Sequence, residues 1–437
     1  MSLRKTDKVL YKYIKDEENR QKTQLQMIAS ENYVSAAVKQ AVGSVLMNKY
    51  SEGQVGKRYY QGNQNIDKIE ATAKERALKA FKLNPSKWGV NVQAANGSAA
   101  NLAAYNALLA IGDKMLSMYL FHGGHLSHGW QLDDGTKVSM TSKIYKPHYY
   151  YVDPKTQKFN YAEIEKTALK VKPKILISGG TAYPPEINHK KMADIAKKVG
   201  AYYMADIAHE AGLVLTGANK SPFKYADIVT MTTRKTLRGP IGAMIFSRKE
   251  LSERIDRSVF PGLQGGPLNH SIAGIAAALS EAMKPGFKKY SEQILKNAKT
   301  LAKELSKRDF TIISGGTEKH LILIDLSNKG IDGWYTAWAL DYAGIITNRS
   351  TFPGDTGSPY YPNGLRLGTP AITTRGMKEK QMIVIASWID EVVGVTKELV
   401  QKSQGSRKQF KLLAQKDKTI KSIEIQVKAL CAKFPVP

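Results

Sequence analysis

Residues 228–240 read IVTMTTRKTLRGP, an apolar run of strand length that leads directly into a lysine within a short turn. Residues 202–209, YYMADIAH, form a second such run that ends in polar side chains. Further stretches of strand length begin at Lys114, Lys174 and Ala243. Such runs, bounded by Gly, Thr and charged residues, predict buried strands.

Longer amphipathic stretches alternate with these strands and begin near Ala99, at His189 and after Pro267. This alternation predicts an α/β fold with a mostly parallel central sheet. After about Pro285 the pattern changes to a long basic helix followed by the short strands FTII, HLILIDL and IITN. We therefore expect an N-terminal arm over residues 1–40, a large domain over 41–285 and a smaller α+β domain over 286–437.

The last helix carries one apolar stripe at spacings of three and four, which predicts packing against the small domain. The stripe consists of Ile420, Ile423, Val427, Leu430 and Phe434.

The composition bears on the cellular location of the protein and on the kinds of site it can contain. No apolar run is long enough to cross a bilayer, the first 22 residues are charged and polar, and Cys431 is the only cysteine, so we expect a cytoplasmic protein without disulfides or a multi-cysteine metal site. The 65 Lys and Arg against 38 Asp and Glu give a net charge of +27. These cations are scattered and lack a nucleic-acid motif, which favours solvated helix faces over an RNA or DNA site.

Polar residues at strand ends carry the expected chemistry, because ligands of open parallel sheets bind there. Asn96-Gly97-Ser98 suits either a phosphate or an ordinary helix N-cap. Asp206 at a strand end can pair with a pyridinium nitrogen, although an N-cap role is the alternative. Lys235 follows the next strand, and burial would favour the neutral amine that attacks an aldehyde. Together these residues predict a pyridoxal phosphate (PLP) enzyme with Lys235 as the Schiff-base lysine.

Three histidines stand close together in HGGHLSHG, residues 122–129. Their composition suggests metal ligands, but glycines flank them and no Cys or acidic residue lies close by. An imidazole stacked over an aromatic cofactor explains one of them better, and we expect no metal.

Eight segments, taken in order and spacing, resemble serine hydroxymethyltransferase over nearly the whole chain. They are IASENY from Ile28, NKYSEG from Asn48, GKRYYQG from Gly56, HGGHLSHG, DIAHEAGL, TTRKTLRGP, FPGLQGGP and GLRLGTPAITTRG. The resemblance implies the aspartate-aminotransferase-like fold (fold type I), a homodimer or pair of dimers with shared active sites, and exchange of a hydroxymethyl group between serine and tetrahydrofolate.

The resemblance also implies roles for individual residues. Around the cofactor it places the attachment lysine Lys235, Asp206 on the ring nitrogen, His125 on the ring face, Thr181 and His209 on the phenolic side, Gly97 and Ser98 on the phosphate, Arg234 nearby, and Gly265, Gly266 and Tyr50 from the neighbouring subunit. Around the substrates it places Arg366 and Ser30 on the carboxylate, Glu52 as acid/base, Tyr60 near the substrate from the other subunit, and Leu120, Leu126 and Ser350 at the pterin.

The sequence departs from the family pattern near the cofactor. Arg234 replaces the usual histidine before the lysine, and Ile241 replaces the usual arginine after Gly-Pro, so we hypothesise that the cation gained at one position compensates for the cation lost at the other. Asn96, Leu263 and Ser350 also differ from the usual segments, and Ser350 bears on folate use.

Two other functions stay open from sequence alone. A folate-independent aldolase or transaldolase acting on threonine-type β-hydroxy amino acids needs the same cofactor apparatus without a pterin pocket. A catalytically weakened protein that binds RNA through its basic surface is motivated only by the net charge and Arg234.

Overall fold

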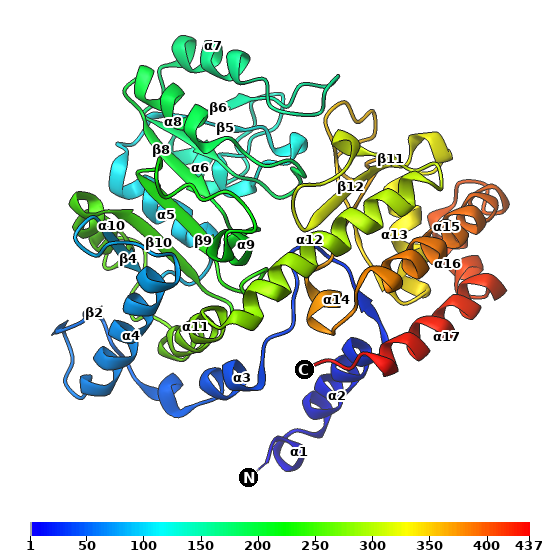
Figure 1. Cartoon of the computed structure of the whole chain (residues 1–437), viewed down its shortest axis with the longest axis horizontal. Helices are drawn as coiled ribbons and strands as arrows, with labels where there is room; N and C mark the ends of the chain where they lie inside the picture. Colours follow the sequence, from blue (N-terminus) through cyan, green and yellow to red (C-terminus); the bar gives the residue numbers. More distant parts are fainter. Residues whose placement is uncertain (1) are drawn as a thin grey trace. The chain divides into compact units, whose positions relative to one another are not determined.

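The computed structural model describes residues 2–437, which form two compact units (Figure 1). The large unit comprises residues 34–295 and 352–354, and the small unit comprises the remaining residues. The chain passes from one unit to the other within helix α12 (Pro285–Ser306). Residues up to Tyr33 belong to the small unit. The N-terminal arm expected over residues 1–40 and the domain boundary expected at 285/286 stay predictions.

A seven-stranded sheet forms the centre of the large unit, in the order β4-β10-β9-β8-β7-β5-β6. β5 through β9 pair in parallel, and β10 runs antiparallel to both of its neighbours. The five strands predicted from sequence are all present in it. The bounds are β4 (Trp88–Asn91), β5 (Lys114–Met118), β6 (Lys146–Tyr150), β7 (Ile175–Ser178), β8 (Tyr202–Asp206), β9 (Ile228–Thr232) and β10 (Ala243–Arg248).

Both faces of the central part of this sheet are buried, because alternate residues of β5, β7, β8, β9 and β10 enter different apolar clusters. On β8, Tyr203 and Ala205 enter the cluster with α4, α7, α8 and α11, whereas Met204 enters the one with α5 and α10. The helices are α3 (Ala36–Val42), α4 (Gln64–Ala80), α5 (Gly97–Leu108), α6 (Met140–Ile144), α7 (Tyr161–Val171), α8 (His189–Lys198), α9 (Ala211–Thr216), α10 (Ser252–Val259) and α11 (Asn269–Ala282). The expected α/β class is confirmed.

The small unit holds an antiparallel sheet in the order β11-β12-β15-β14. The predicted IITN strand is two short pieces, of which β13 pairs in parallel with β1 and β14 pairs with β15. The strands are β1 (Leu25–Gln26), β11 (Thr311–Ile312), β12 (Leu321–Asp325), β13 (Ile345–Ile346), β14 (Asn348–Arg349) and β15 (Gly364–Gly368). The helices wholly within it are α1 (Leu3–Thr6), α2 (Lys8–Thr23), α13 (Gly333–Tyr342), α14 (Pro370–Thr374), α15 (Glu379–Lys402), α16 (Arg407–Ala414) and α17 (Lys418–Lys433).

The stripe on α17 packs as predicted. Ile420, Ile423 and Val427 are buried in the core of the small unit, with Leu430 and Phe434 partly buried against it. Cys431 completes this face and is itself buried, which raises the pKa of its thiol. The last helix therefore covers the small unit with its apolar side and leaves its lysines outside.

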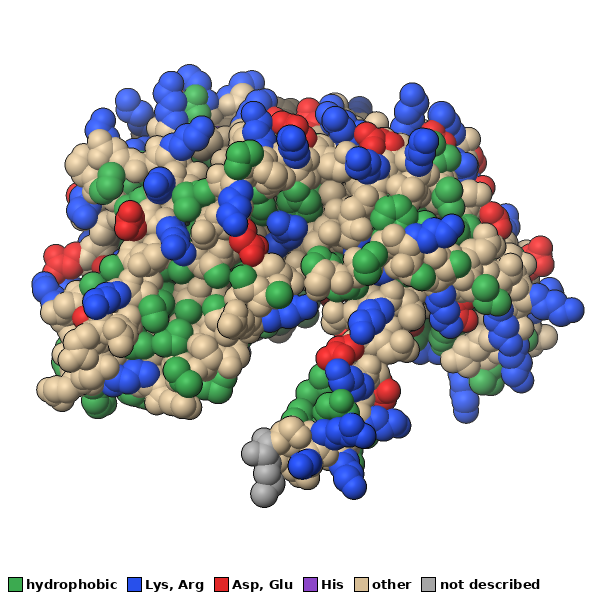
Figure 2. Space-filling model, turned by 60° about the horizontal axis from the view of Figure 1, so that its bottom comes forward, with side chains coloured by type: hydrophobic (Ala, Val, Ile, Leu, Met, Phe, Trp, Pro, Cys, Tyr) green, Lys and Arg blue, Asp and Glu red, His purple; other side chains and the backbone are tan. Residues whose placement is uncertain are grey.

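The basic side chains are spread over the face drawn in Figure 2, with acidic and apolar groups between them. Several lysines pair with an acidic residue one helical turn away, as Lys190 does with Asp194 at 2.8 Å. Among residues 2–437, no helix combines the length and the apolar content that a membrane span needs.

Candidate active site

A cavity of about 420 Å³ lies at the carboxyl ends of β8 and β9 in the large unit. This is the edge of the sheet at which parallel α/β folds bind ligands. Eight of the predicted cofactor residues line the cavity together: Gly97, Ser98, His125, Thr181, Asp206, His209, Arg234 and Lys235. The fold thus gathers residues that are up to 138 positions apart in the chain. Asn96 and Ile241, at which the sequence departs from the family pattern, line it as well.

Asp206 ends β8 and is almost fully buried. Its Oδ2 accepts a hydrogen bond from Asn101 Nδ2 at 2.8 Å and lies 3.1 Å from His128 Nε2. Burial by itself raises the pKa of the Asp206 carboxyl, but the hydrogen bonds from His128 and Asn101 and the charges of His128 and His125 outweigh it and hold the pKa well below its usual range. Asp206 is therefore an anion at neutral pH inside the cavity.

His125 lies on the same cavity, just before the short helical turn η3 (Leu126–His128). Its Nδ1 is 2.7 Å from Ser127 Oγ, which fixes the ring orientation. Burial, His128 and Lys235 lower the pKa of His125 to about 4. The imidazole is therefore neutral at pH 7, and a neutral aromatic ring can stack on a cationic heterocycle.

The depressed pKa of His125 predicts a specific pH dependence of stability. The imidazole binds a proton below about pH 6.5 in the unfolded chain but only near pH 4 in the folded one. The free energy of unfolding therefore keeps its full value above pH 6.5 and decreases as the pH falls toward 4. The loss amounts to at most about 3 kcal/mol. Between pH 6.5 and pH 4, urea unfolding should show a smaller decrease in the free energy of unfolding for His125→Asn than for the wild type. The same decrease in both proteins would contradict the low pKa of His125.

Lys235 is buried to 7% exposure and follows β9 in a turn that runs to β10. Arg238 has a left-handed backbone with φ +59°, and its N–H donates to the carbonyl of Lys235 at 3.1 Å. Gly239 N–H donates to the carbonyl of Thr233 at 2.7 Å, which closes the turn. The amine-bearing side chain is thus held in the cavity on a rigid segment.

The third element of the cavity is the start of α5. Asn96 Oδ1 accepts from Ala99 N–H at 3.0 Å, and the carbonyl of Asn96 accepts from Ala100 N–H at 2.9 Å. Helical geometry leaves the N–H groups of Gly97 and Ser98 without an acceptor inside the helix. A Cβ at Gly97 would come within 2.6 Å of Thr232, so only glycine fits there. The N-cap role of Asn96 is thus observed, and the free N–H groups beside it leave the phosphate role as a prediction.

Thr181 and His209 complete the cavity wall. Thr181 Oγ1 donates to the carbonyl of Gly124 at 3.0 Å, and its N–H donates to Gly123 at 2.7 Å, so the loops after β5 and β7 are joined. His209 is buried in the turn after β8. Both line the same cavity as Asp206 and Lys235, so their side chains could serve the polar groups of a bound ring.

Tyr50, Glu52, Tyr60, Gly265 and Gly266 gather away from the cavity lining. The rings of Tyr50 and Tyr60 meet edge to face at 5.5 Å. A Cβ on Gly266 would lie 3.2 Å from the Tyr50 ring, and one on Gly265 would lie 3.1 Å from a carboxylate oxygen of Glu52. These five residues form one compact group, which we call the tyrosine cluster.

Three further predicted residues lie together in the small unit, around β15. Arg366 is on β15, where its Nε donates to Asn348 Oδ1 at 3.1 Å, and burial lowers its pKa to about 10, so it stays charged at pH 7. Ser350 donates its N–H to the carbonyl of Gly364 at 3.0 Å. Ser30 follows Ala29, which packs against Gly368.

Leu120 and Leu126 are in the two short turns that follow β5, η2 (Leu120–His122) and η3, and neither lines the cavity. Leu126 is 48% exposed. The neighbouring imidazoles have separate partners, because His122 Nδ1 accepts from Val152 N–H at 3.1 Å while His128 contacts Asp206.

Sequence reasoning missed the residues that hold Asp206 and His125 in place. Asn101 donates to both Asp206 Oδ2 and Ser127 Oγ, and its own Oδ1 accepts from Thr230. The available signal was helical spacing, since Asn101 lies one turn after Gly97 and Ser98 on a helix that is otherwise rich in alanine. A buried amide on such a helix requires partners.

The donor set matches PLP by its chemistry. The cavity combines a buried amine, a buried carboxylate that stays ionised, a neutral imidazole and a helix start suited to phosphate. With the seven-stranded, mostly parallel sheet, these features define the class: a PLP-dependent enzyme of fold type I.

Comparison with known proteins identifies the family within this class. The serine hydroxymethyltransferase family model matches residues 3–389. The chain is 46% identical to serine hydroxymethyltransferase of Methanosarcina barkeri, with 99% of each chain covered. It is 44% identical to the cytosolic enzyme of Candida albicans (99% and 96% covered) and 43% identical to the mitochondrial enzyme of Eremothecium gossypii (99% and 91%). The chain belongs to the serine hydroxymethyltransferase family.

Proposed function

We propose that this protein transfers the hydroxymethyl group of L-serine reversibly to tetrahydrofolate, giving glycine and 5,10-methylenetetrahydrofolate. Family membership over the full chain, together with the intact cavity around Lys235, carries this proposal. The relatives at 42–46% identity are all named serine hydroxymethyltransferase, which favours the transferase over a folate-independent aldolase.

Several residues that line the cavity each have a proposed role toward one part of the cofactor. When bound, PLP supplies an aldehyde for covalent attachment and a pyridinium ring that accepts the electron pair of the broken Cα–Cβ bond. The Lys235 amine attaches the cofactor, and the Asp206 carboxylate keeps a proton on the ring nitrogen. His125 packs on the ring face, Thr181 and His209 hold the phenolic oxygen, and the N–H groups of Gly97 and Ser98 hold the phosphate.

Substrate handling falls to residues outside the cavity lining. The planar guanidinium of Arg366 suits bidentate binding of the serine carboxylate, with Ser30 assisting. Glu52 takes or returns the proton of the serine hydroxyl, and Tyr60 lies beside the substrate. Leu120, Leu126 and Ser350 are assigned to the pterin, where the Ser350 hydroxyl can still donate and accept one hydrogen bond.

We further propose a homodimer, or a pair of dimers, in which the tyrosine cluster completes the site of the neighbouring subunit. Large apolar side chains are exposed on the two segments that carry this cluster, which a monomer rarely leaves uncovered. They are Val45, Met47, Tyr50, Tyr59, Tyr60, Leu263 and Leu268. A Tyr59–Phe260 ring contact at 5.6 Å joins the two segments into one surface.

A cytoplasmic location is part of the proposal. Its support is the relative from Candida albicans, which is named as cytosolic, and a cysteine content of one buried residue. Other relatives are named as mitochondrial or chloroplastic, so fractionation of the source cells is the test.

The experiment that tests the activity is glycine formation from serine by the PLP-loaded protein, with and without tetrahydrofolate. A large folate-dependent increase supports the transferase. Cleavage of threonine-type substrates with no effect of folate would replace it with the aldolase function. RNA binding at physiological salt, with no amino-acid turnover, would indicate the third function.

The exchange of cations at residues 234 and 241 predicts coupling between these positions. Arg234 and Ile241 both line the cavity, so a cation at either position contributes to the same local field. A double-mutant cycle of Arg234→His and Ile241→Arg on PLP affinity should show that the second substitution offsets part of the loss caused by the first. Strict additivity of the two effects would disprove compensation.

A further inference from the structure

The segment that carries Tyr50, Glu52 and Tyr60 has a backbone held far more firmly than an irregular surface loop requires. It lies between the short turn η1 (Val45–Asn48) and α4, and contains only the two-residue strands β2 (Gly53–Gln54) and β3 (Lys57–Arg58). So short a hairpin is marginal by itself. Its position must therefore be set by contacts from outside the hairpin.

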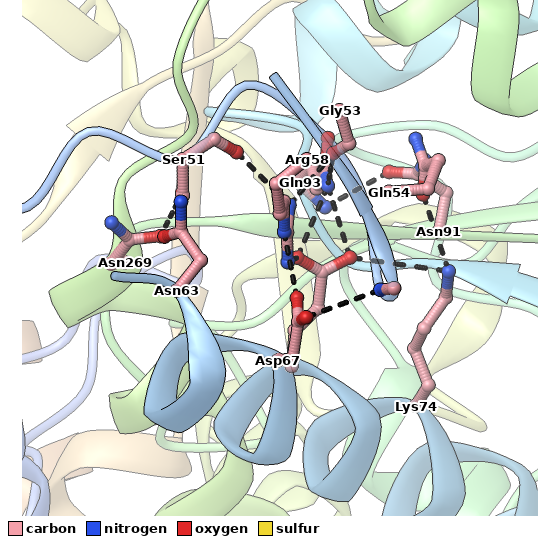
Figure 3. A network of polar contacts seen from close by, with 12 residues as sticks. Ser51, Gly53, Gln54, Arg58, Asn63, Asp67, Lys74, Asn91, Gln93 and Asn269 are labelled. Atoms are coloured by element: carbon pink, nitrogen blue, oxygen red, sulfur yellow. Dashed lines mark hydrogen bonds and ion pairs between the residues drawn. The ribbon is translucent and has the colours of Figure 1, made fainter. Parts of the chain in front are cut away.

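Arg58 supplies the central contacts (Figure 3). Its side chain is only 3% exposed, and its guanidinium donates to Asp67 at 2.8 Å and to Glu70 at 2.7 Å. Both acceptors lie on α4, and the carboxylate of Glu70 also accepts from Gln93, just beyond β4, at 3.0 Å. The guanidinium is thus bound directly to α4 and, through Glu70, indirectly to the end of β4.

The same guanidinium donates hydrogen bonds to the backbone on both sides of Glu52. Arg58 Nη1 donates to the carbonyl of Ser51 at 2.9 Å and to that of Gly53 at 2.7 Å. The carbonyl of Glu52 between them accepts from Tyr59 N–H at 3.1 Å. Three successive carbonyls around the proposed acid/base residue are therefore held by Arg58 and its neighbour.

Neighbouring contacts extend this control to both tyrosines. Asn63 Nδ2 donates to the carbonyl of Tyr60 at 2.8 Å and to that of Tyr50 at 3.4 Å. Asn269 accepts from Ser51 Oγ at 2.6 Å and donates to the carbonyl of Lys49 at 2.7 Å. The backbone is held from within the unit, whereas the side chains of Tyr50 and Tyr60 are 56% and 46% exposed.

Geometry explains why this position holds arginine rather than lysine. The guanidinium donates along several directions in one plane and meets two carboxylates and two carbonyls at once. Burial by itself lowers the pKa of Arg58, but Glu70 and Asp67 outweigh it and raise the pKa above its usual value. A lysine keeps the charge but cannot serve all four acceptors.

We propose that Arg58 is a positioning residue for the reaction: it fixes the backbone of residues 51–53 so that the carboxylate of Glu52 is presented in one orientation. This inference rests on the proposed function, in which Glu52 handles the proton of the serine hydroxyl. The reason a rigid backbone matters is that a displacement of about 1 Å in a catalytic group can cost about 100-fold in rate.

The test uses the PLP-loaded enzyme and the conservative variant Arg58→Lys, with Lys74→Met as the matched control. Lys74 belongs to the same polar network, 3.9 Å from Glu70, but does not contact the carbonyls of residues 51 and 53. Arg58→Lys should lower kcat for glycine formation about 100-fold, whereas Lys74→Met should stay within about threefold of the wild type. Equal effects of the two variants would overturn the proposal.

A double-mutant cycle separates positioning from general damage to the fold. In a Glu52→Gln background, Arg58→Lys should cost less than about threefold, because the group that Arg58 orients is already gone. An undiminished 100-fold loss in that background would show that Arg58 acts on the fold and not through Glu52.

Hydrogen exchange supplies a readout independent of activity. Amides of residues 53–60 should lose protection in Arg58→Lys, while those of α5 keep it. Unchanged exchange in residues 53–60 would overturn the proposal directly. If the wild type forms no glycine from serine, the proposed function fails, and the exchange result alone decides whether Arg58 holds this segment.

Discussion

Replacing Lys235 by alanine is expected to lower glycine formation from serine by on the order of 10⁴-fold. Lys235 is buried and lines the cavity together with Asp206 and His125, and among residues 2–437 no second lysine lines it that could substitute. Lys235→Arg should fail equally, because a guanidinium cannot be deprotonated to attack an aldehyde. The measurement is single-turnover and steady-state glycine formation by variants reconstituted with PLP.

Lys249→Ala is a control for this experiment, since Lys249 lies beyond β10 and is exposed. It should retain wild-type activity. A Lys235→Ala variant that keeps even a tenth of the wild-type rate would remove Lys235 from its proposed role.

The second large effect is recovery of activity when two inactive variants are mixed. If the tyrosine cluster serves the partner's cavity, a hybrid dimer of Glu52→Gln and Lys235→Ala chains contains one site with both defects and one with neither. Random reassociation makes half of the dimers hybrids, so activity should rise to about a quarter of the wild-type value. The measurement is glycine formation after mild dissociation and mixing of the two proteins.

The control mixes Asp206→Asn with Lys235→Ala chains. Both residues line the same cavity of one chain, so every hybrid site carries a defect. This mixture should stay inactive. Failure of the first mixture to recover, in samples where hybrids are demonstrated, would mean that each chain's cavity works without its partner's tyrosine cluster.

Much of the fold could be predicted because its signals are local. The five predicted strands are largely apolar because residues on both of their faces are buried, whereas the edge strands β4 and β6 (KPHYY) were not predicted. The periodicity of α17 indicated its buried side. The IITN segment was harder, because Ile345 and Ile346 pair with Leu25 and Gln26, more than 300 residues earlier. No local pattern indicates such a pairing.

Some residues of the candidate site could likewise be predicted from local sequence, and others could not. Asp206 and Lys235 could be recognised because one ends a strand and the other closely follows the next strand, at the edge of the sheet where ligands bind. The roles of His128 and Arg58 could not be predicted, because they depend on distant partners: Arg58 reaches Glu70 through the folding of a short hairpin onto α4. The helical spacing of Asn101 pointed to the site but not to its partner Asp206, 105 positions away. A buried polar side chain acquires its role only when the packing supplies its partners.

The most direct test of the central claim, that this cavity carries PLP on Lys235, is reduction of the PLP-loaded protein with borohydride, followed by protease digestion and mass spectrometry. The structure predicts a single modified peptide that contains Lys235, and its loss in Lys235→Ala. Modification at another lysine, or none in a protein that is active with serine, would contradict the account of the site.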